Sequence, residues 1–328
     1  MNIAVLGAGA WGTAIASSLA PQHAVTLWAR DPAQCAAMRA RRVNERYLPG
    51  HAFPTELEVN DDIGAALGRA ELALVAVTTA ALRETLRRVT AVNSQVPLVW
   101  LCKGFEPGSA KLPHEICSEE LGRSKDVGAL SGPSFAQEVA LGLPTAVTLA
   151  SASDEFARSA ARIVHGPALR VYSSDDLIGV EVAGAVKNVM AIAAGISDGL
   201  RYGHNARAAL ITRGLAEITR FGVALGGRPE TFGGLAGAGD LILTCTGDLS
   251  RNRQVGMRLA RGERLHDILR ELGHVAEGVN SAREVQLMAE RLGVDMPITS
   301  AVCRVLADHT QARSAADELL RREPKAEL

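Results

Sequence analysis

The chain has 328 residues, enough for about two domains of ordinary size. Hydrophobic residues make up 47% of it and charged residues 22%, as is usual for soluble globular proteins. Its 35 basic and 36 acidic residues nearly cancel, which excludes an overall charge that recruits nucleic acid or an anionic membrane. Any anion-binding site must therefore be local.

The five cysteines lie far apart and include no CxxC pair. This argues against a disulfide framework or a zinc site, so we expect no metal and a reducing, cytoplasmic location. The apolar N-terminus lacks the basic start of a secretory signal and carries three glycines. No segment reaches about 18 uninterrupted apolar residues, so we predict no membrane span.

In the first half of the chain, apolar runs of strand length alternate with helix-like segments. This alternation is typical of βαβ units, so we expect an α/β, Rossmann-like domain with a mostly parallel, doubly wound sheet over residues 1–176. The predicted strands are Ile3–Leu6, Val25–Trp28, Leu72–Val77, Leu98–Cys102, Val127–Leu130, Ala146–Leu149 and Leu169–Tyr172. The predicted helices include Gly12–Leu19, Pro32–Arg42 and Ala80–Val89.

The pattern changes after residue 176. From Leu177 onward no convincing strand occurs, and periodic apolar positions and Ala/Gly-rich stretches dominate. We expect helix breaks at the glycines near 226–227, 233–239, 262 and 293. The sequence therefore predicts an all-α domain over residues 177–328 that carries the substrate-binding and catalytic groups.

The N-terminal segment Gly7–Gly12 has the pattern GxGxxG, directly after a predicted strand and before a helix expected to open at Thr13. In this context Gly7 permits a tight turn, Gly9 lets the backbone approach a pyrophosphate, and Gly12 lets the helix pack on the strand. The pattern predicts a dinucleotide-binding loop. The alternative is a glycine-rich turn without a ligand.

The end of the second predicted strand bears on the choice of cofactor. Arg30 could pair with a 2′-phosphate, whereas the usual NAD signal is an acid that bonds the ribose 2′-hydroxyl. Asp31 could be that acid, but it precedes Pro32 and has the position of a helix N-cap. We therefore predict that NADP(H) is preferred or shared with NAD(H).

The predicted helix 180–197 consists of Ala, Val, Ile, Met and Gly except for four polar residues. One of these is Lys187, and burying a lysine without a partner costs several kcal/mol, so such a lysine usually has a task. A nicotinamide site transfers hydride to a carbonyl carbon, and a desolvated lysine with a lowered pKa can supply the proton. The alternative is a lysine whose ammonium reaches solvent.

Two further segments carry candidate site residues in the second half. Asp240 follows a run with four glycines in seven residues and could orient Lys187, or it could cap the helix 241–245. Ser250 is a good N-cap, which places Arg251 and Asn252 in the first turn of a helix. Since an arginine there opposes the helix dipole, we expect a phosphate or carboxylate site, with a solvated basic turn as the alternative.

Two loops in the first half follow predicted strands. Lys103-Gly104 follows the strand 98–102, and the segment Ser131–Ala136 follows the strand 127–130. Ligands bind at the carboxyl ends of strands in open α/β sheets, so we expect both loops at the same edge as the GxGxxG loop. Each could also be an ordinary turn.

Taken together, these segments resemble the soluble bacterial type of NAD(P)-dependent glycerol-3-phosphate dehydrogenase. The matching stretches run in the order of that family over about 280 residues. They are GAGAWGTAIA (Gly7–Ala16), CKG (Cys102–Gly104), SGPSFAQEVA (Ser131–Ala140), EVAGAVKNVMAIAAGISDGL (Glu181–Leu200), NARAALITRGLAEITR (Asn205–Arg220), GLAGAGDLILTCTGDLSRNR (Gly234–Arg253) and VAEGVNSAREV (Val275–Val285).

The resemblance implies reversible reduction of dihydroxyacetone phosphate to sn-glycerol 3-phosphate for phospholipid synthesis, by a homodimer. It implies Lys187 as proton donor and acceptor at the C2 oxygen, with Asp240 and Lys103 as further catalytic groups. The implied substrate contacts are Lys103, Gly132, Ser134, Lys187, Asp240, Ser250, Arg251 and Asn252. The implied cofactor contacts are Gly7, Gly9, Ala10, Trp11, Gly12, Arg30, Lys103, Ala136, Arg251, Val275 and Glu277. Relatives carry Ser or Thr before the loop tryptophan, a hydroxyl that Ala10 lacks.

Two other functions remain open at this point. A different two-domain dehydrogenase that acts on a hydroxyacid would share both halves of the predicted fold. A dinucleotide-sensing protein without activity would explain the glycine-rich loop, but it gives no reason for Lys187 and Asp240 in apolar settings.

Overall fold

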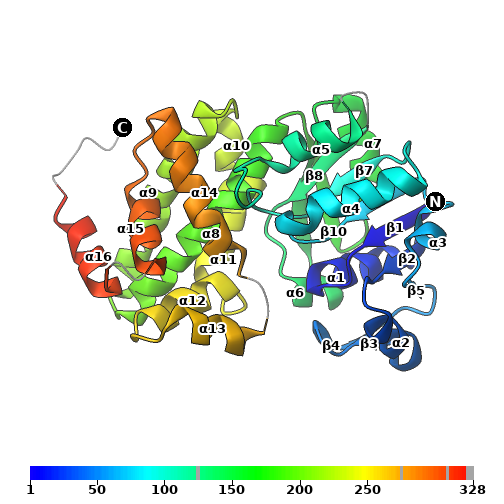
Figure 1. Ribbon diagram of the computed structural model, residues 1–328, viewed down its shortest axis with the longest axis horizontal. Coiled ribbons are helices and arrows are strands. Elements are labelled where there is room, and N and C mark those ends of the chain that lie inside the picture. The colour runs from blue at the N-terminus through cyan, green and yellow to red at the C-terminus, as the bar shows by residue number, and fades with distance from the viewer. Residues whose placement is uncertain (123–125, 274–275, 308–309, 323–328) are drawn as a thin grey trace. The chain divides into compact units, whose positions relative to one another are not determined.

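The computed structural model describes the chain except residues 123–125, 274–275, 308–309 and 323–328 (Figure 1). It forms two compact units. The N-terminal unit comprises Met1–Lys103 and Lys111–Glu181, and the helical unit comprises Gly104–Ala110 and Val182–Leu328. These ranges are not those of the predicted domains, 1–176 and 177–328, whose separate roles stay a prediction.

The N-terminal unit contains an eight-stranded sheet in the order β10-β9-β8-β7-β6-β1-β2-β5. Every predicted strand is present, with ends that differ by at most two residues, and β5 and the hairpin β3–β4 are additional. The sheet strands are β1 (Asn2–Leu6), β2 (Ala24–Trp28), β5 (Glu58–Asn60), β6 (Leu72–Val75), β7 (Leu98–Trp100), β8 (Val127–Ser131), β9 (Thr145–Ala150) and β10 (Leu169–Ser174), and the hairpin is β3 (Val43–Asn44) with β4 (Leu48–Ala52).

The sheet is mostly parallel, as predicted, but β9 pairs antiparallel with β8 and parallel with β10. The connection from β8 to β9 holds one helix, the five-residue α6 (Ala136–Ala140). A helix of that length rises about 7.5 Å, less than half the length of a five-residue strand at about 3.3 Å per residue. It is too short to carry the chain back along the sheet, so β9 returns in the opposite direction.

Both faces of the sheet are covered by helices, because alternate strand residues are apolar on both sides. Ile3 and Val5 belong to a core with buried residues of α1, α2 and α7, whereas Leu6 and Trp100 point to the opposite face, over which α4 and α5 lie (Figure 1). The helices of this unit are α1 (Ala10–Leu19), α2 (Pro32–Arg41), α3 (Ile63–Leu67), α4 (Thr79–Val92), α5 (Pro113–Leu121), α6 and α7 (Asp154–Val164).

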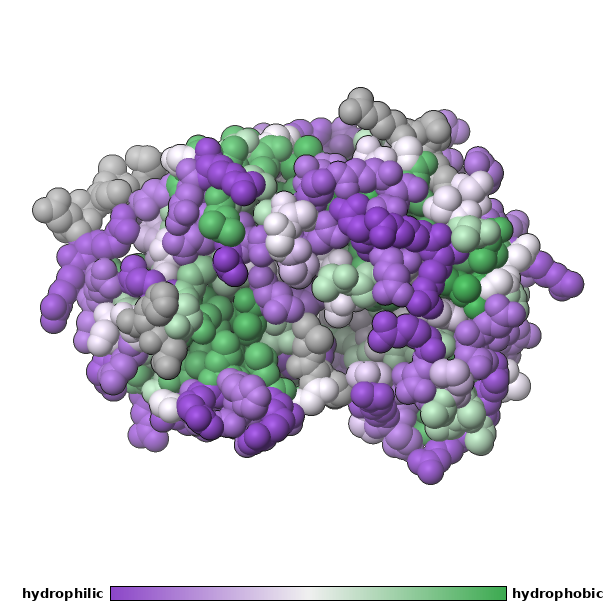
Figure 2. All heavy atoms as spheres, viewed as in Figure 1, coloured by the Kyte–Doolittle hydropathy of each residue, from purple (hydrophilic) through white to green (hydrophobic). Residues whose placement is uncertain are grey.

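The described part of the helical unit has no strand, as predicted. Its elements are the rest of α8 (Leu177–Gly199), α9 (Gly203–Ala224), α10 (Pro229–Gly233), the π-helix η1 (Leu235–Gly239), α11 (Asp240–Thr246), α12 (Arg251–Leu259), α13 (Leu265–Leu272), α14 (Glu277–Leu292), α15 (Pro297–Leu306) and α16 (Ala312–Leu320). Figure 2 shows apolar side chains gathered on part of this unit's visible surface.

Helix α8 is the core of the helical unit. By length and composition it could cross a membrane, but 94% of its most apolar window is buried inside the protein. Helices α9, α12 and α14 lie against it at glycines: Gly214 lies beside Met190, Gly256 beside Ile192, and Gly278 beside Asn188. The apolar, glycine-rich sequence of α8 thus reflects close helix packing on several sides.

The segment Gly104–Ala110 follows Lys103, which lies three residues after the end of β7, and it belongs to the helical unit. The ring of Phe105 lies 6.1 Å from that of Phe221, and the backbone N–H of Gly108 donates to Glu284 Oε1 at 3.1 Å. One of the predicted ligand loops therefore stands where the chain passes from one unit to the other.

Candidate functional site

The GxGxxG loop joins β1 to α1 with the geometry that a dinucleotide requires. Gly7 has φ +118°, which only glycine adopts readily, and a Cβ on Gly12 would lie 1.9 Å from the Gly7 carbonyl oxygen. A Cβ on Gly9 would meet nothing within 4 Å. The backbone at Gly9 thus faces open space, as needed for the approach of a pyrophosphate. The helix opens at Ala10 rather than at Thr13, because Gly9 is its N-cap.

Two amide side chains hold the GxGxxG loop in place by hydrogen bonds. Asn44 Nδ2 donates to the Ala8 carbonyl at 3.0 Å and to Thr13 Oγ1 at 2.8 Å, and Gln34 Nε2 donates to the same carbonyl at 3.0 Å. Asn44 is buried in the two-residue strand β3. These contacts were not predicted, since no sequence pattern links residue 44 to the loop.

At the end of β2, Asp31 has the predicted role of a helix N-cap, and Arg30 does not share it. The Asp31 carboxylate accepts from the Ala33 backbone N–H at 2.9 Å and is the N-cap of α2. Arg30 is exposed and makes no hydrogen bond or ion pair to another described residue. The acid is thus occupied as a cap, whereas the guanidinium remains available to an anion.

The two predicted ligand loops meet at the carboxyl ends of neighbouring strands. Lys103 Nζ donates to the Gly132 carbonyl at 3.1 Å, and Ser134 Oγ donates to the same oxygen at 3.0 Å. Gly132 has φ +135° and packs against Val147, and Ala136 opens α6. The Lys103 ammonium, the Ser134 hydroxyl and the N-terminus of α6 therefore lie close together at the ends of β7 and β8.

In the helical unit, Lys187 is part of a buried polar cluster. Its ammonium donates to Asp240 Oδ1 and to Thr244 Oγ1, the latter at 2.9 Å. The side chains of Lys187 and Asp240 are 8% and 1% exposed. The alternative of a lysine that reaches solvent is wrong, because α8 is enclosed by other helices and α11 provides the counter-ion. Thr244, one turn after Asp240, was not predicted.

Asp240 owes its position to the glycine run before it. The predicted break near 233–239 is confirmed at its start, where α10 ends at Gly233 and Gly234 is extended. Residues 235–239 are not part of the break, because they form a π-helix that continues into α11. A Cβ on Gly237 would lie 2.1 Å from the Phe232 carbonyl oxygen, and thus glycine permits this tight winding. Asp240 makes no side-chain cap; it faces Lys187 instead of capping 241–245.

The segment after α11 forms the predicted helix start. Ser250 Oγ accepts from the Arg253 backbone N–H at 3.3 Å and caps α12, with Arg251 and Asn252 in the first turn. Arg251 is exposed, with no hydrogen bond or ion pair to another described residue. Asn252 is buried; its Nδ2 donates to Asn188 Oδ1 at 3.0 Å and its Oδ1 accepts from Gly278 N at 3.1 Å. Asn252 therefore joins three helices.

The structure also gives the state of the cysteines and the positions of the remaining predicted cofactor contacts. Burial raises the pKa of Cys245, which lies on α11, to about 12, so its thiol stays neutral. All five cysteines are free, and the described residues include no cluster that could hold a metal ion. Glu277 is the first residue of α14, and Trp11, on α1, packs against the core of the N-terminal unit. Val275 lies outside the described residues.

Comparisons with known proteins agree with this geometry. Family models described as NAD-dependent glycerol-3-phosphate dehydrogenase N-terminus and C-terminus match residues 2–157 and 176–317. A Nitrosomonas eutropha protein named glycerol-3-phosphate dehydrogenase (NAD(P)+) is 59% identical over 327 residues, which cover 100% of this chain and 99% of that protein.

Solved structures give the same result. A glycerol-3-phosphate dehydrogenase crystal structure from Coxiella burnetii has a TM-score of 0.93 at 42% identity and covers 98% of both chains. The enzyme of that name from Saccharomyces cerevisiae has a TM-score of 0.81 at 29% identity and covers 97% of this chain and 98% of its own. The chain belongs to the NAD-dependent glycerol-3-phosphate dehydrogenase family.

Proposed function

We propose that this chain catalyses the reversible, NAD(P)H-dependent reduction of dihydroxyacetone phosphate to sn-glycerol 3-phosphate, which supplies phospholipid synthesis. The observation that carries the proposal is the buried cluster of Lys187, Asp240 and Thr244 in a member of this family. The Lys187 side chain is 8% exposed on an apolar helix, and a merely structural pair with Asp240 would not require a charge at this position. A proton donor at the C2 oxygen explains its retention.

A dinucleotide fits the residues present. Gly9 leaves the open space into which a pyrophosphate would enter, and the N-terminus of α1 offers backbone N–H groups to it. The chemistry that a bound nicotinamide supplies is hydride transfer between its C4 and the C2 carbon of the substrate. Relatives are named for NAD(P)+, and the exposed Arg30 beside the occupied Asp31 supports a preference for NADP(H).

In the proposed mechanism Lys187 gives a proton to the C2 oxygen on reduction and takes it back on oxidation. Asp240 and Thr244 hold the ammonium by accepting two of its hydrogen bonds. Arg251 and the first turn of α12 bind the substrate phosphate, a guanidinium beside backbone N–H groups. The remaining proposed contacts are Lys103, Gly132, Ser134, Ser250 and Asn252 for substrate, and Gly7, Ala10, Trp11, Gly12, Lys103, Ala136, Arg251, Val275 and Glu277 for the cofactor.

The experiment that tests the proposal is the decrease of NADPH absorbance with dihydroxyacetone phosphate, repeated with NADH. We expect turnover with dihydroxyacetone phosphate and none with 2-keto acids. Turnover of a keto acid alone would instead support a hydroxyacid dehydrogenase. Binding of NADPH without its consumption by any ketone would support a sensor.

We also propose that the enzyme is a cytoplasmic homodimer. Large apolar side chains stay exposed on the helical unit, among them Val223, Ile242 and Leu249, as expected of a surface that meets another copy. Multi-angle light scattering of the purified chain should give twice the mass of one chain, and a monomer at micromolar concentration would contradict the dimer.

A further inference from the structure

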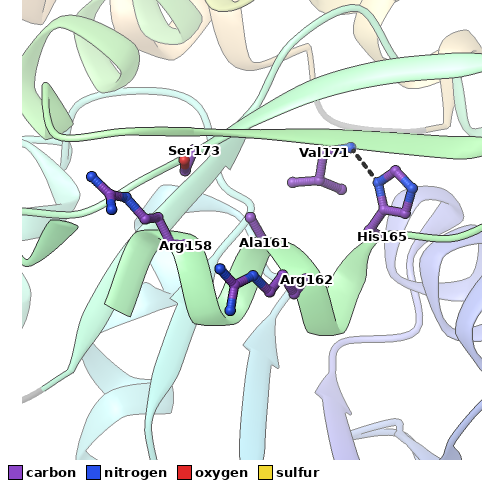
Figure 3. Close-up of a pocket in the computed structure, with 6 residues that line it drawn as sticks. All are labelled: Arg158, Ala161, Arg162, His165, Val171 and Ser173. Atoms are coloured by element: carbon purple, nitrogen blue, oxygen red, sulfur yellow. Dashed lines mark hydrogen bonds between the residues drawn. The ribbon is translucent and has the colours of Figure 1, made fainter. Parts of the chain in front are cut away.

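A surface pocket of about 240 Å³ lies on the N-terminal unit, between α7 and the edge strand β10. In the sheet order, β10 stands five strands from β1, which is about 24 Å at about 4.8 Å per strand. The pocket is therefore separate from the GxGxxG loop that follows β1. It is lined by Arg158, Ala161, Arg162, His165, Val171 and Ser173 (Figure 3).

The polar groups around this pocket are donors. Arg158 and Arg162 lie four residues apart on α7 and so share one helix face. His165 is the residue directly after the helix, and Ser173 adds a hydroxyl from β10. Figure 3 shows both arginine side chains leaving successive turns of the helix. No carboxylate lines the pocket. In a chain whose charges nearly cancel, this local set of donors matches a ligand with several acceptor oxygens.

His165 can donate a hydrogen bond into the pocket from Nε2, because its Nδ1 already accepts one. His165 Nδ1 lies 3.3 Å from the backbone nitrogen of Val171 and accepts its N–H, the dashed line of Figure 3. In the neutral ring the proton is then on Nε2, which leaves an N–H to donate. The same hydrogen bond satisfies a backbone N–H of the edge strand β10 that has no neighbouring strand to pair with, and it fixes the position of the ring.

The two arginines differ in how their charges are balanced. Arg158 pairs with Asp154 on the preceding turn, at 2.5 Å between its Nη2 and Oδ2. Arg162 has no hydrogen bond or ion pair to another described residue, although it lies one turn from another arginine. The dipole of α7 favours a cation in the last turn, but it does not explain a row of donors beside a hollow. An anion in the pocket would balance this charge.

We propose that this pocket is a second anion site, which binds inorganic phosphate or a small soluble phosphate ester. Pockets for drug-sized ligands measure about 300–1,000 Å³, so a hollow of about 240 Å³ suits a phosphate with a short organic group rather than a dinucleotide. The site lies outside the residues proposed for catalysis, and its ligand would act as an effector rather than as a substrate.

Calorimetric titration of inorganic phosphate into the full chain tests the proposal. The chain carries R251A, which removes the phosphate contact proposed for the substrate site. Adding R162E or R162Q should weaken phosphate binding about tenfold, the loss of one charge-assisted hydrogen-bond donor. Adding R170E should change binding by less than about twofold, because Arg170 is an exposed arginine of β10 that does not line the pocket.

Three results would overturn the proposal. One is the absence of phosphate binding in the R251A chain, and another is equal weakening by R162E and R170E, which would mean general attraction to surface charge. The third is Arg162-dependent sedimentation with phosphatidic acid vesicles by a chain that ignores inorganic phosphate, which would mean recognition of a lipid headgroup. Turnover of dihydroxyacetone phosphate by R162E alone should be unchanged without added phosphate, so this test is independent of the proposed reaction.

Discussion

Lys187 is the residue on which the proposed chemistry most directly depends. Replacing it by alanine removes the proton donor, so kcat should fall about 10²–10⁴-fold in steady-state assays with NADPH and dihydroxyacetone phosphate. The same change leaves the buried Asp240 carboxylate without its ammonium partner, which costs about 3–5 kcal/mol of stability.

A double variant separates these two effects. K187A/D240N removes the negative charge together with the positive one, so the free energy of unfolding should recover relative to K187A, as measured in urea. Turnover should not recover. Near-normal kcat in a folded K187A chain would reject the role proposed for Lys187.

Arg251 should act through binding rather than through the proton transfer. Its exposed guanidinium opens α12 beside backbone N–H groups, so R251A should raise the KM for dihydroxyacetone phosphate about 10–100-fold, the value of one or two charged hydrogen bonds. The KM for free dihydroxyacetone, which lacks the phosphate, should change little. An equal change for both substrates would remove the phosphate role.

We expect Asn44 to affect cofactor binding indirectly, by holding the GxGxxG loop, without contacting the cofactor. N44A removes the two hydrogen bonds that hold Ala8 and Thr13, so the KM for NADPH should rise about tenfold with kcat nearly unchanged. The matched control is N93A. Asn93 follows α4, donates to the Leu67 carbonyl and accepts from the Gln95 backbone N–H, away from the GxGxxG loop. A fall in kcat with an unchanged KM would contradict a positioning role.

Sequence reasoning found the groups that carry local signals. Gly7 and Gly12 stand in a spaced motif, and Lys187 is conspicuous because its neighbours are apolar. It missed Asn44 and Thr244, whose importance comes from contacts 31 and 57 residues away. No local pattern encodes such pairs, because they depend on how the helices and strands pack.

At the scale of elements, the close approach of α12 to α8 makes a sharp prediction. A Cβ on Gly256 would lie 2.0 Å from the Ile192 carbonyl oxygen, so G256A must push the two helices apart. Overpacking of this kind costs about 1–3 kcal/mol, more than the gain from replacing glycine by alanine in a helix. The measurement is the free energy of unfolding in urea.

The control is G233A, where a Cβ would meet nothing within 4 Å and φ is not positive. This variant should unfold within about 1 kcal/mol of the natural chain. If G256A were as stable as G233A, close packing at this crossing would not limit stability.

Local sequence patterns were sufficient to predict some helices and strands but not others. Long apolar strands and α8 were predicted because their composition differs clearly from their surroundings. The direction of β9 was not, because it depends on the length of the connecting helix rather than on the strand's own residues. Strand β5 has only three residues, two of them polar, and the sequence of the π-helix 235–239 looks like a glycine-rich break. Neither is long enough to show a periodic pattern.

For the whole molecule, stability should depend on pH through Glu217. This residue of α9 is 2% exposed, and its carboxylate accepts from the Ile298 backbone N–H at 2.7 Å and from that of Thr299 at 3.4 Å. It thereby caps α15, whose N-cap residue Met296 makes no side-chain cap. Burial raises the pKa of Glu217 from 4.5 to about 7, although these hydrogen bonds and Arg220 oppose the rise, and Asp295 adds to it.

The sign of the effect follows from proton uptake. Between pH 4.5 and 7 the folded chain keeps this proton and the unfolded chain has lost it, so stability falls as pH rises through this range and then levels off. A shift from 4.5 to about 7 corresponds to about 3 kcal/mol. E217Q cannot titrate at this position but can still accept the Ile298 hydrogen bond, so it should lack this part of the pH dependence.

The measurement is the free energy of unfolding in urea at pH 5, 6, 7 and 8 for both chains. The stability of the natural chain relative to E217Q should fall by about 2.5 kcal/mol from pH 5 to pH 8, with most of the change between pH 5 and 7. The control E230Q alters an exposed glutamate of α10, and its difference from the natural chain should stay constant across this range. A constant difference for E217Q as well would mean that Glu217 is ionised throughout and that the capping contacts outweigh its burial.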